Sequence, residues 1–128
     1  RDLVLKCVIE GSEWNLLGRA QSDDLAHFEQ MVIEFHDFNF LQHEDHLDFA
    51  FMTLEKVNRT HAPIHVHGNN NDSPRKINGI WICPVLEVTY VRRDLGALVP
   101  SNELFPTELD APNNSGWGDI PLGRFTYV

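Results

Sequence analysis

The chain contains 128 residues, of which 42% are hydrophobic, 23% charged and 10% aromatic. This is an ordinary globular composition, and it excludes a disordered or fibrous chain. Nineteen acidic residues against ten basic ones give a net charge of -9, which disfavours binding to nucleic acids or anionic lipids. The chain has no apolar run of membrane-spanning length and no signal peptide. We therefore expect a soluble, cytoplasmic protein with neither a nucleic-acid nor a membrane partner.

The N-terminal third contains two apolar runs that are typical of buried strands. Residues 3–9 (LVLKCVI) form a nearly continuous apolar run, which fits a strand covered on both faces. Ser12 provides an N-cap for a short helix that Gly18 ends, and residues 22–28 add a second short helical piece. Residues 30–36 (QMVIEFH) are predicted to form a second strand, with alternate side chains on one face: Met31, Ile33 and Phe35.

The clearest helix covers residues 45–59. Its apolar residues recur at the spacing of a core-facing stripe, which consists of Leu47, Ala50, Phe51, Leu54 and Val57. Residues 64–68 (IHVHG) are predicted to form a third strand, and residues 69–78 a polar loop. Residues 80–85 and 86–93 read as one or two further strands.

Strands that alternate with helices predict a mostly parallel α/β sheet. The closing strands follow one another without a helix, so we expect them to pair antiparallel. We divide the chain into residues 1–94, which carry this sheet, and residues 95–128, an irregular Pro-rich tail packed on it.

Polar side chains collect where the predicted strands end, which is where open α/β sheets bind ligands. They are Glu10, Glu34, His36, His65, His67, Asn69 and Asn70. His36 or His67 could act as a general base, because histidine titrates near neutrality. Glu10, Glu34, His36 and His67 could instead bind a metal. A third interpretation is that Glu34 and His36 simply pair with each other or cap loop backbone.

The remaining histidines and the cysteines are given structural roles. His27, His43, His46 and His61 are expected at the solvated surface. Cys7 and Cys83 are expected to be buried free thiols in a reducing compartment. The sequence contains none of the glycine-rich phosphate loops or the GxSxG nucleophile elbow.

Five segments, in the right order, resemble S-adenosylmethionine-dependent methyltransferases of the FkbM type. Residues 5–14 (LKCVIEGSEW) are similar to that family's LKxDIEGxEW segment, and residues 32–36 (VIEFH) to its fifth strand. Three further segments are similar to one subgroup of the family: HVHGNN (65–70), PVLEVTY (84–90), and LDAPN with DIPL (109–113 and 119–122).

The resemblance implies the C-terminal half of a Rossmann-like methyltransferase sheet, whose last strand runs antiparallel to the others. It also implies that the S-adenosylmethionine-binding half precedes Arg1 and would be this chain's partner. The intact enzyme would methylate a hydroxyl of a sugar or other small molecule. Glu10, His36 and His67 would then be catalytic, and Glu34, His65, Asn69 and Asn70 would bind the acceptor; no metal is assigned.

One departure from the family pattern concerns position 8, where the family has Asp and this chain has Val8. Valine can neither accept a proton nor bind a metal, so either the site is impaired or Glu10 and His36 take over the role. Two alternatives to an enzyme of this kind follow. One is a non-catalytic glycan- or protein-binding module with a decayed site. The other is a metal-dependent hydrolase that uses Glu34, His36, His65 and His67.

Overall fold

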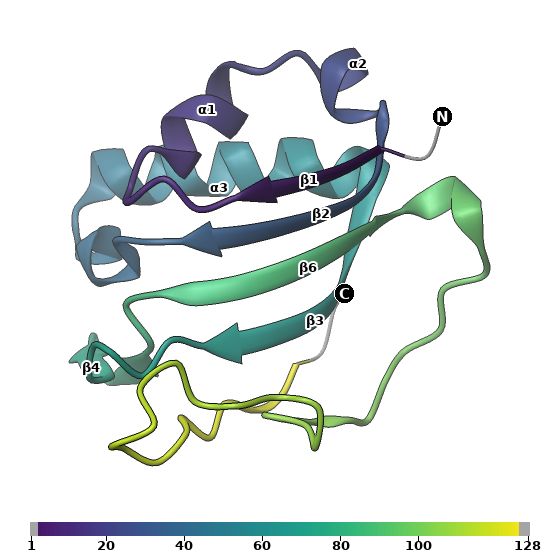
Figure 1. Ribbon diagram of the computed structural model, residues 1–128. Coiled ribbons are helices and arrows are strands. Elements are labelled where there is room, and N and C mark those ends of the chain that lie inside the picture. Colours follow the sequence, from purple (N-terminus) through teal and green to yellow (C-terminus); the bar gives the residue numbers. More distant parts are fainter. Residues whose placement is uncertain (1–2, 126–128) are drawn as a thin grey trace.

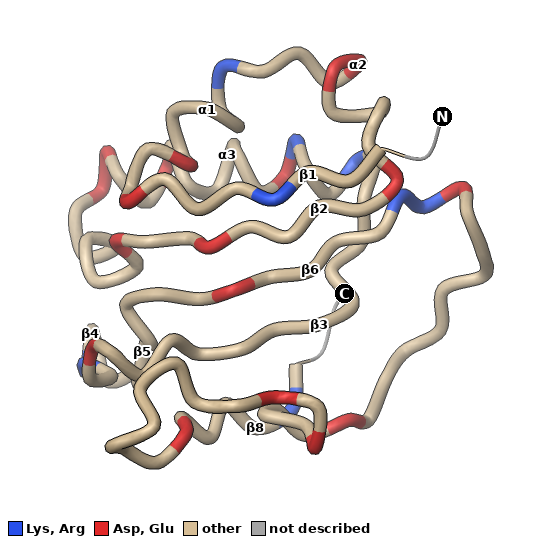
Figure 2. The backbone as a smooth tube through the Cα atoms, in the orientation of Figure 1, with Lys and Arg blue, Asp and Glu red and all other residues tan. Residues whose placement is uncertain are grey.

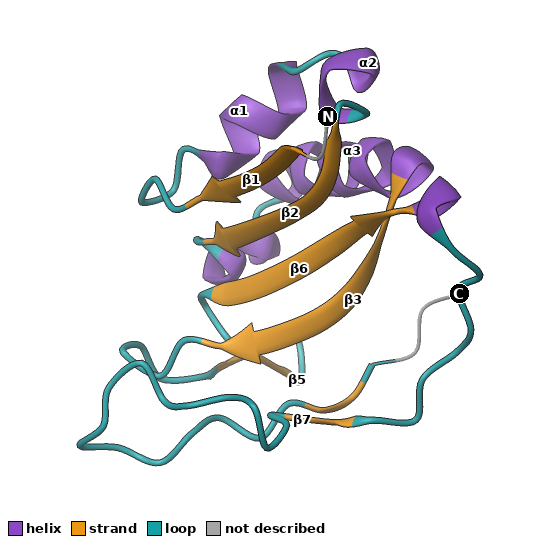
Figure 3. Ribbon diagram, turned by 45° about the vertical axis from the view of Figure 1, so that its right-hand side comes forward, coloured by secondary structure: helices purple, strands orange, loops and turns teal. Residues whose placement is uncertain are grey.

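The computed structural model describes residues 3–125, which form a four-stranded sheet with helices on one side (Figures 1 and 3). In chain order the elements are β1 (Leu3–Cys7), α1 (Glu13–Arg19), α2 (Ser22–Leu25), β2 (Phe28–Phe35), η1 (Phe38–Gln42), α3 (Glu44–Thr60), β3 (His61–Gly68), β4 (Arg75–Ile77), β5 (Ile80–Ile82), β6 (Leu86–Arg92), η2 (Arg93–Leu95), β7 (Leu104–Phe105) and β8 (Gly123–Arg124). Among these elements no helix is both long and apolar enough to cross a membrane.

The strand order in the main sheet is β1-β2-β6-β3. β1 and β2 pair parallel, whereas β6 pairs antiparallel with both β2 and β3. β1, β2 and β3 therefore run in one direction and β6 runs against them. The mixed α/β class and the antiparallel closing strands are confirmed.

The prediction of mostly parallel pairing is corrected, because two of the three pairings in this sheet are antiparallel. The reason is the position of β6, which inserts between β2 and β3 and so separates two strands of the same direction. Periodicity reports which face of a strand is buried, but it does not report which strand lies beside it.

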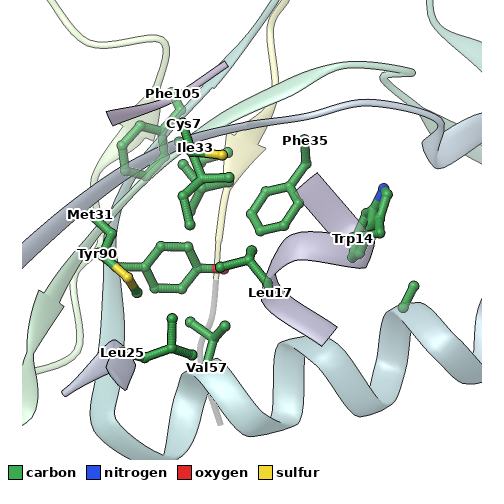
Figure 4. Packing of buried hydrophobic residues seen from close by; sticks show 13 residues of the cluster. Cys7, Trp14, Leu17, Leu25, Met31, Ile33, Phe35, Val57, Tyr90 and Phe105 are labelled. Atoms are coloured by element: carbon green, nitrogen blue, oxygen red, sulfur yellow. The ribbon is translucent and has the colours of Figure 1, made fainter. Parts of the chain in front are cut away.

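The hydrophobic core lies between the sheet and the helices (Figure 4). Met31, Ile33 and Phe35 are completely buried on the helix side of β2, as their alternation predicts. Trp14 packs on Phe35 with ring centroids 4.7 Å apart, and Leu17 follows it one turn later in α1. The apolar residues of α1 thus fix where the end of β2 lies.

The helix at residues 45–59 is confirmed as α3, but its predicted core stripe is partly wrong. Ala50 and Val57 are buried, whereas Leu47 and Phe51 are 47% and 67% exposed. Thr53 is buried in their place. The helix is rotated so that the stripe through Ala50, Thr53 and Val57 meets α1 and the sheet, and a polar residue therefore occupies a core position.

Two other burial predictions are corrected. β1 is an edge strand with Leu3 and Val4 exposed, so it is not covered on both faces. His61 is completely buried at the start of β3, where its Nε2 donates to the Phe28 carbonyl at 2.9 Å. The third strand begins at His61, three residues before its predicted start, because the chain passes directly from α3 into β3.

Residues 69–85, which follow β3, contain a hairpin that begins inside the predicted polar loop. β4 and β5 form a small separate hairpin inside residues 69–85, and only β6 joins the main sheet. The tail contributes the short pair β7 and β8, and Phe105 belongs to the buried cluster. The predicted segment 1–94 begins, and the predicted segment 95–128 ends, in residues 1–2 and 126–128, which lie outside the described residues.

The second face of the sheet carries no helix (Figures 1 and 3). Register places one row of side chains across this face: Glu34 on β2, Glu87 on β6 and His67 on β3. The row opposite the helices is therefore polar, whereas the corresponding row on the helix side contains Ile33, Val88 and Val66.

Candidate functional site

Three of the predicted site residues come together at the carboxyl ends of β1 and β2. His36 Nε2 lies 3.5 Å from Glu10 Oε2 and 4.0 Å from Glu34 Oε2. Neither distance is a good hydrogen bond. Glu34 and His36 nevertheless form an ion-pair contact at 4.0 Å, as the third interpretation of these residues predicts. His36 and Glu34 are largely buried, whereas the Glu10 side chain is exposed.

Glu13 completes this group, and sequence reasoning did not single it out as a site residue. It is completely buried in the first turn of α1. Its Oε1 accepts hydrogen bonds from the backbone N–H groups of Ile9 and Gly11 and from His36 Nδ1 at 3.0 Å. Because Oε1 is the acceptor in all three contacts, Nδ1 of His36 carries a proton. In the neutral imidazole, Nε2 is then the unprotonated nitrogen.

The backbone of His36 is held as firmly as its ring. Trp14 Nε1 donates to the His36 carbonyl oxygen at 2.7 Å. Glu13 and Trp14 are consecutive residues, and together they fix both the imidazole and the peptide of His36. The sequence could have indicated this contact through the consecutive residues Glu13 and Trp14. A carboxylate and a buried indole at the start of a helix can reach the end of the neighbouring strand.

Unusual backbone conformations surround the group. Glu10 and Asp37 have positive φ values of 53° and 65°, and the adjacent Gly11 has a φ of 96°. The positive φ favours glycine at position 11, and a Cβ there would lie 2.9 Å from Asp37 Oδ2, so the Asp37 carboxylate would have to move. Positive φ at non-glycine residues is uncommon and concentrates at functional sites.

Asn69 lies close to the same group, as its predicted role requires. Its Nδ2 donates to Glu34 Oε1 at 2.7 Å across the sheet. The Glu34 carboxylate therefore has one oxygen fixed by the amide, while Oε2 faces His36. Val8 follows β1 and is 43% exposed, and it adds no polar atom here.

His67 lies in a second group, which the tail completes. Its Nε2 lies 3.0 Å from both carboxylate oxygens of Asp119, and its Nδ1 lies 3.9 Å from Glu87 Oε2. Glu87 Oε1 in turn accepts from Asn113 Nδ2 at 2.6 Å. Glu87, Asn113 and Asp119 were not predicted as site residues, because nothing local in the sequence indicates that the tail returns to β3.

The side chains of His65 and Asn70 form hydrogen bonds to residues of the C-terminal tail. His65 Nε2 bonds Asp110 Oδ1 at 2.8 Å. Burial raises the pKa of the Asp110 carboxyl, but hydrogen bonds from the Thr107 N–H and hydroxyl and from His65 outweigh it. The pKa of Asp110 is therefore held below its usual range. Asn70 Nδ2 donates to the carbonyls of Asn114 and Gly118, and its Oδ1 accepts from Asn114 N–H.

Two apolar pockets lie elsewhere. One, of about 380 Å³, is lined by residues that include Phe38, Leu41, Trp81, Cys83, Ile120 and Leu122. The other, of about 490 Å³, lies between β3 and the segment 97–101. Neither is lined by a predicted site residue.

Within residues 3–125, no group of three or more His, Cys, Asp or Glu side chains is arranged to hold a metal ion. The chain has no match among protein-family models, curated proteins or solved structures.

Proposed function

We propose that this chain is the acceptor-binding part of an S-adenosylmethionine-dependent O-methyltransferase of the FkbM type, which acts on a hydroxyl of a sugar or other small molecule. The observation that carries the proposal is the Glu13–His36 hydrogen bond of 3.0 Å. In the neutral ring this bond leaves Nε2 of His36 as the lone-pair nitrogen, which lies between Glu10 and Glu34. A nitrogen so placed can take the proton of a hydroxyl as the oxygen attacks a methyl group.

The arrangement of the sheet supports the proposal. The resemblance implies a Rossmann-like sheet whose last strand opposes the others, and β6 is the last strand of the main sheet and runs against β1, β2 and β3. β1 is an edge strand with Leu3 and Val4 exposed, and such an edge favours pairing with a further strand.

S-adenosylmethionine would supply the methyl group. The resemblance places it beside the end of β1, where this chain presents Val8. The exposed valine side chain offers packing surface but no hydrogen bond. We therefore assign binding of the cofactor to the other half of the domain, as the resemblance implies.

Within this chain, positioning is the main contribution expected to methyl transfer, because the reaction is an in-line displacement. Glu13 and Trp14 fix His36, Asn69 fixes Glu34, and Glu10 is exposed to meet the acceptor. His67 is held by Asp119 and would contact the acceptor further along the sheet. We place the enzyme in the cytoplasm, because Cys7 and Cys83 are both buried free thiols, which are typical of a reducing compartment.

The test uses the longest natural protein that carries this sequence. Binding of S-adenosylhomocysteine is measured by calorimetry, and methyl transfer from tritiated S-adenosylmethionine is measured with a panel of sugars and glycosides. We expect His36→Gln to lower kcat about 100-fold or more with cofactor binding intact. His43→Gln, an exposed histidine, is the matched control. Absence of cofactor binding, or unchanged kcat in His36→Gln, would overturn the proposal.

A second candidate is a non-catalytic glycan- or protein-binding module, and Val8 is the observation that favours it. The variant Val8→Asp separates the two. Methyl transfer by the natural protein supports the enzyme. Transfer that appears only after Val8→Asp identifies a decayed site.

A further inference from the structure

The apolar pocket of about 490 Å³ beside β3 lies away from the group formed by Glu10, Glu34 and His36. One wall consists of residues 62–64, in the first half of β3. β2 and β3 run in the same direction, so the beginning of β3 and the carboxyl end of β2 lie at opposite ends of the sheet. The pocket is therefore a separate site, and its volume falls within the range of about 300–1,000 Å³ that is typical of small-molecule sites.

The opposite wall is the irregular segment 97–101. Figure 3 shows the loop that contains it leading from η2 to β7, and in the part of the chain that the structure describes this segment joins no sheet and forms no backbone–backbone hydrogen bond. Its Leu98 and Val99 are 44% and 80% exposed, and Ile64 on the β3 wall is 47% exposed. Apolar side chains on both walls are thus left in contact with solvent, which is the usual mark of a binding surface when such side chains are contiguous.

Buried core residues form the inner surface of the pocket. Ala62 and Phe105 both line it, and they are 7% and 5% exposed. The Phe105 ring packs edge-on against His65 at a centroid distance of 5.2 Å and against Phe125 at 6.1 Å. Since Phe105 is fixed by the core, it offers a preformed surface on which an apolar ligand can pack.

The charge of the lining differs from that of the chain as a whole. Acidic residues outnumber basic ones by nineteen to ten. Among the described residues that line this pocket, however, none is Asp or Glu, and Arg93 alone is charged. Figure 2 shows the uncharged stretch, residues 95–102, that leads away from η2. The pocket thus combines apolar walls with one cation at its rim.

The guanidinium group of Arg93 is held at one nitrogen and open at the other two. Its Nε donates to the Asn58 carbonyl oxygen at 2.8 Å, in the last turn of α3. The adjacent Asp94 pairs with Arg92 at 2.7 Å, and Arg93 has no ion pair with any residue between 3 and 125. Its Nη1 and Nη2 groups, which can bind a carboxylate through two parallel hydrogen bonds, therefore have no partner among the described residues.

Ser101 is the other polar side chain of the lining. Its Oγ accepts from the Glu103 N–H at 3.1 Å, which leaves the hydroxyl hydrogen without an acceptor in the described part of the chain. Both polar side chains of the pocket can therefore donate hydrogen bonds to a ligand, and one of them is positively charged.

We propose that this pocket binds an amphipathic carboxylic acid. The apolar body of the ligand would lie between β3 and the segment 97–101, on Phe105, and its carboxylate would accept from Nη1 and Nη2 of Arg93. An alcohol with the same body would lose the charge-assisted hydrogen bonds, and an ammonium would meet a cation. Fatty acids and arylalkanoic acids share this chemistry. The site does not depend on the proposed methyltransferase function.

The test uses the 128-residue chain labelled with nitrogen-15 and titrated at constant ionic strength with octanoate, 1-octanol, octylammonium and acetate. We expect octanoate to shift the amides of residues 62, 64 and 97–99 and to bind about fivefold or more tightly than 1-octanol. Acetate, which has the charge without the chain, should not bind measurably. The net charge of -9 disfavours anions, so a preference for octanoate over octylammonium reports the pocket itself. The tighter of octanoate and 4-phenylbutyrate assigns the ligand to fatty acids or to arylalkanoic acids.

Two variants separate the charge from the apolar walls. Arg93→Gln should abolish the preference for octanoate over 1-octanol, whereas Arg75→Gln, the same change at a 58% exposed side chain on β4, should keep it. Val99→Asp should weaken octanoate binding about tenfold or more, because it places a carboxylate in the wall. Leu109→Asp is its matched control, since Leu109 is 90% exposed and lies outside the lining.

The comparison of ligands on the natural sequence needs no variant, and the amide spectrum shows whether each variant is folded. Equal binding of octanoate and 1-octanol, or shifts confined to amides outside the lining, would overturn the proposal. Unchanged octanoate binding in folded Arg93→Gln would do the same.

Discussion

Glu13 in α1 and His36 at the end of β2 are joined by a 3.0 Å hydrogen bond between Oε1 and Nδ1, although 23 positions separate them in sequence. Glu13 is completely buried, and its Oε1 also accepts from the N–H groups of Ile9 and Gly11. One carboxylate thus organises the ends of both β1 and β2. Every chemical role given to His36 depends on this contact.

Removal of the Glu13 carboxylate should therefore change the tautomer of His36. In Glu13→Ala, Nδ1 loses its acceptor and two backbone donors lose theirs, so we expect destabilisation of about 1–3 kcal/mol as well. Long-range nitrogen–proton spectra at pH 8 report which ring nitrogen carries the proton. We expect Nδ1–H in the wild type and a shift toward Nε2–H in the variant. Glu13→Gln, which keeps an acceptor oxygen, should retain the wild-type tautomer. The same tautomer in Glu13→Ala would contradict a positioning role.

The corrected core predicts opposite outcomes for two phenylalanines. Phe35 is completely buried beneath Trp14, whereas Phe51 is 67% exposed on α3. Phe35→Ala should cost about 3–5 kcal/mol through lost burial and a cavity. Phe51→Ala should stay within about 0.5 kcal/mol of the wild type. Urea unfolding followed by tryptophan fluorescence measures both. Similar losses in the two variants would restore the stripe inferred from periodicity.

His61 predicts acid sensitivity of the fold. Burial lowers the pKa of its imidazole from the ordinary value of 6.5, and the hydrogen bond to the Phe28 carbonyl opposes this only in part. The unfolded chain then binds a proton below about pH 6.5 that the folded chain does not, so the free energy of unfolding falls as pH decreases through that range. The contribution is present above pH 6.5 and is lost on acidification.

The measurement for His61 is urea unfolding between pH 8 and pH 5. His61→Gln can still donate to the Phe28 carbonyl but does not titrate, so its stability should depend less on pH than that of the wild type. The exposed His27→Gln is the control and should keep the wild-type slope. Identical slopes for the wild type and His61→Gln would show that His61 does not cause the sensitivity.

Asn70 should hold the turn at residues 114–118 in place. Its side chain donates to the carbonyls of Asn114, Trp117 and Gly118 and accepts from the Asn114 N–H. Asn70→Ala removes all of these bonds, and the turn contains the 71% exposed Trp117. We expect chymotrypsin to cleave after Trp117 several-fold faster, measured by mass spectrometry. Asn71→Ala is the matched control, because the Asn71 side chain donates to its neighbour Asn69 Oδ1 and, among residues 3–125, has no hydrogen bond to the turn. Equal cleavage rates in the two variants would mean that other contacts hold the turn.

Local pattern was sufficient for several features. Alternation along residues 30–36 identified the face of β2 that Met31, Ile33 and Phe35 share, because successive side chains of a strand point to opposite sides. The 3.6-residue period located α3 to within one residue at each end. The grouping of Glu10, Glu34 and His36 at the carboxyl ends of β1 and β2 followed from the parallel direction of these strands, since parallel strands end at the same edge of a sheet.

Tertiary structure alone decided the rest. Insertion of β6 between β2 and β3 made most pairings antiparallel and set Glu34 opposite Glu87. Return of the tail to β3 gave His65 and His67 their aspartate partners, 45 and 52 positions away in the chain. Burial of His61 followed from the direct passage of α3 into β3. Sequence periodicity reports the environment of one element at a time, whereas these contacts depend on which elements become neighbours, and packing of the whole chain determines that.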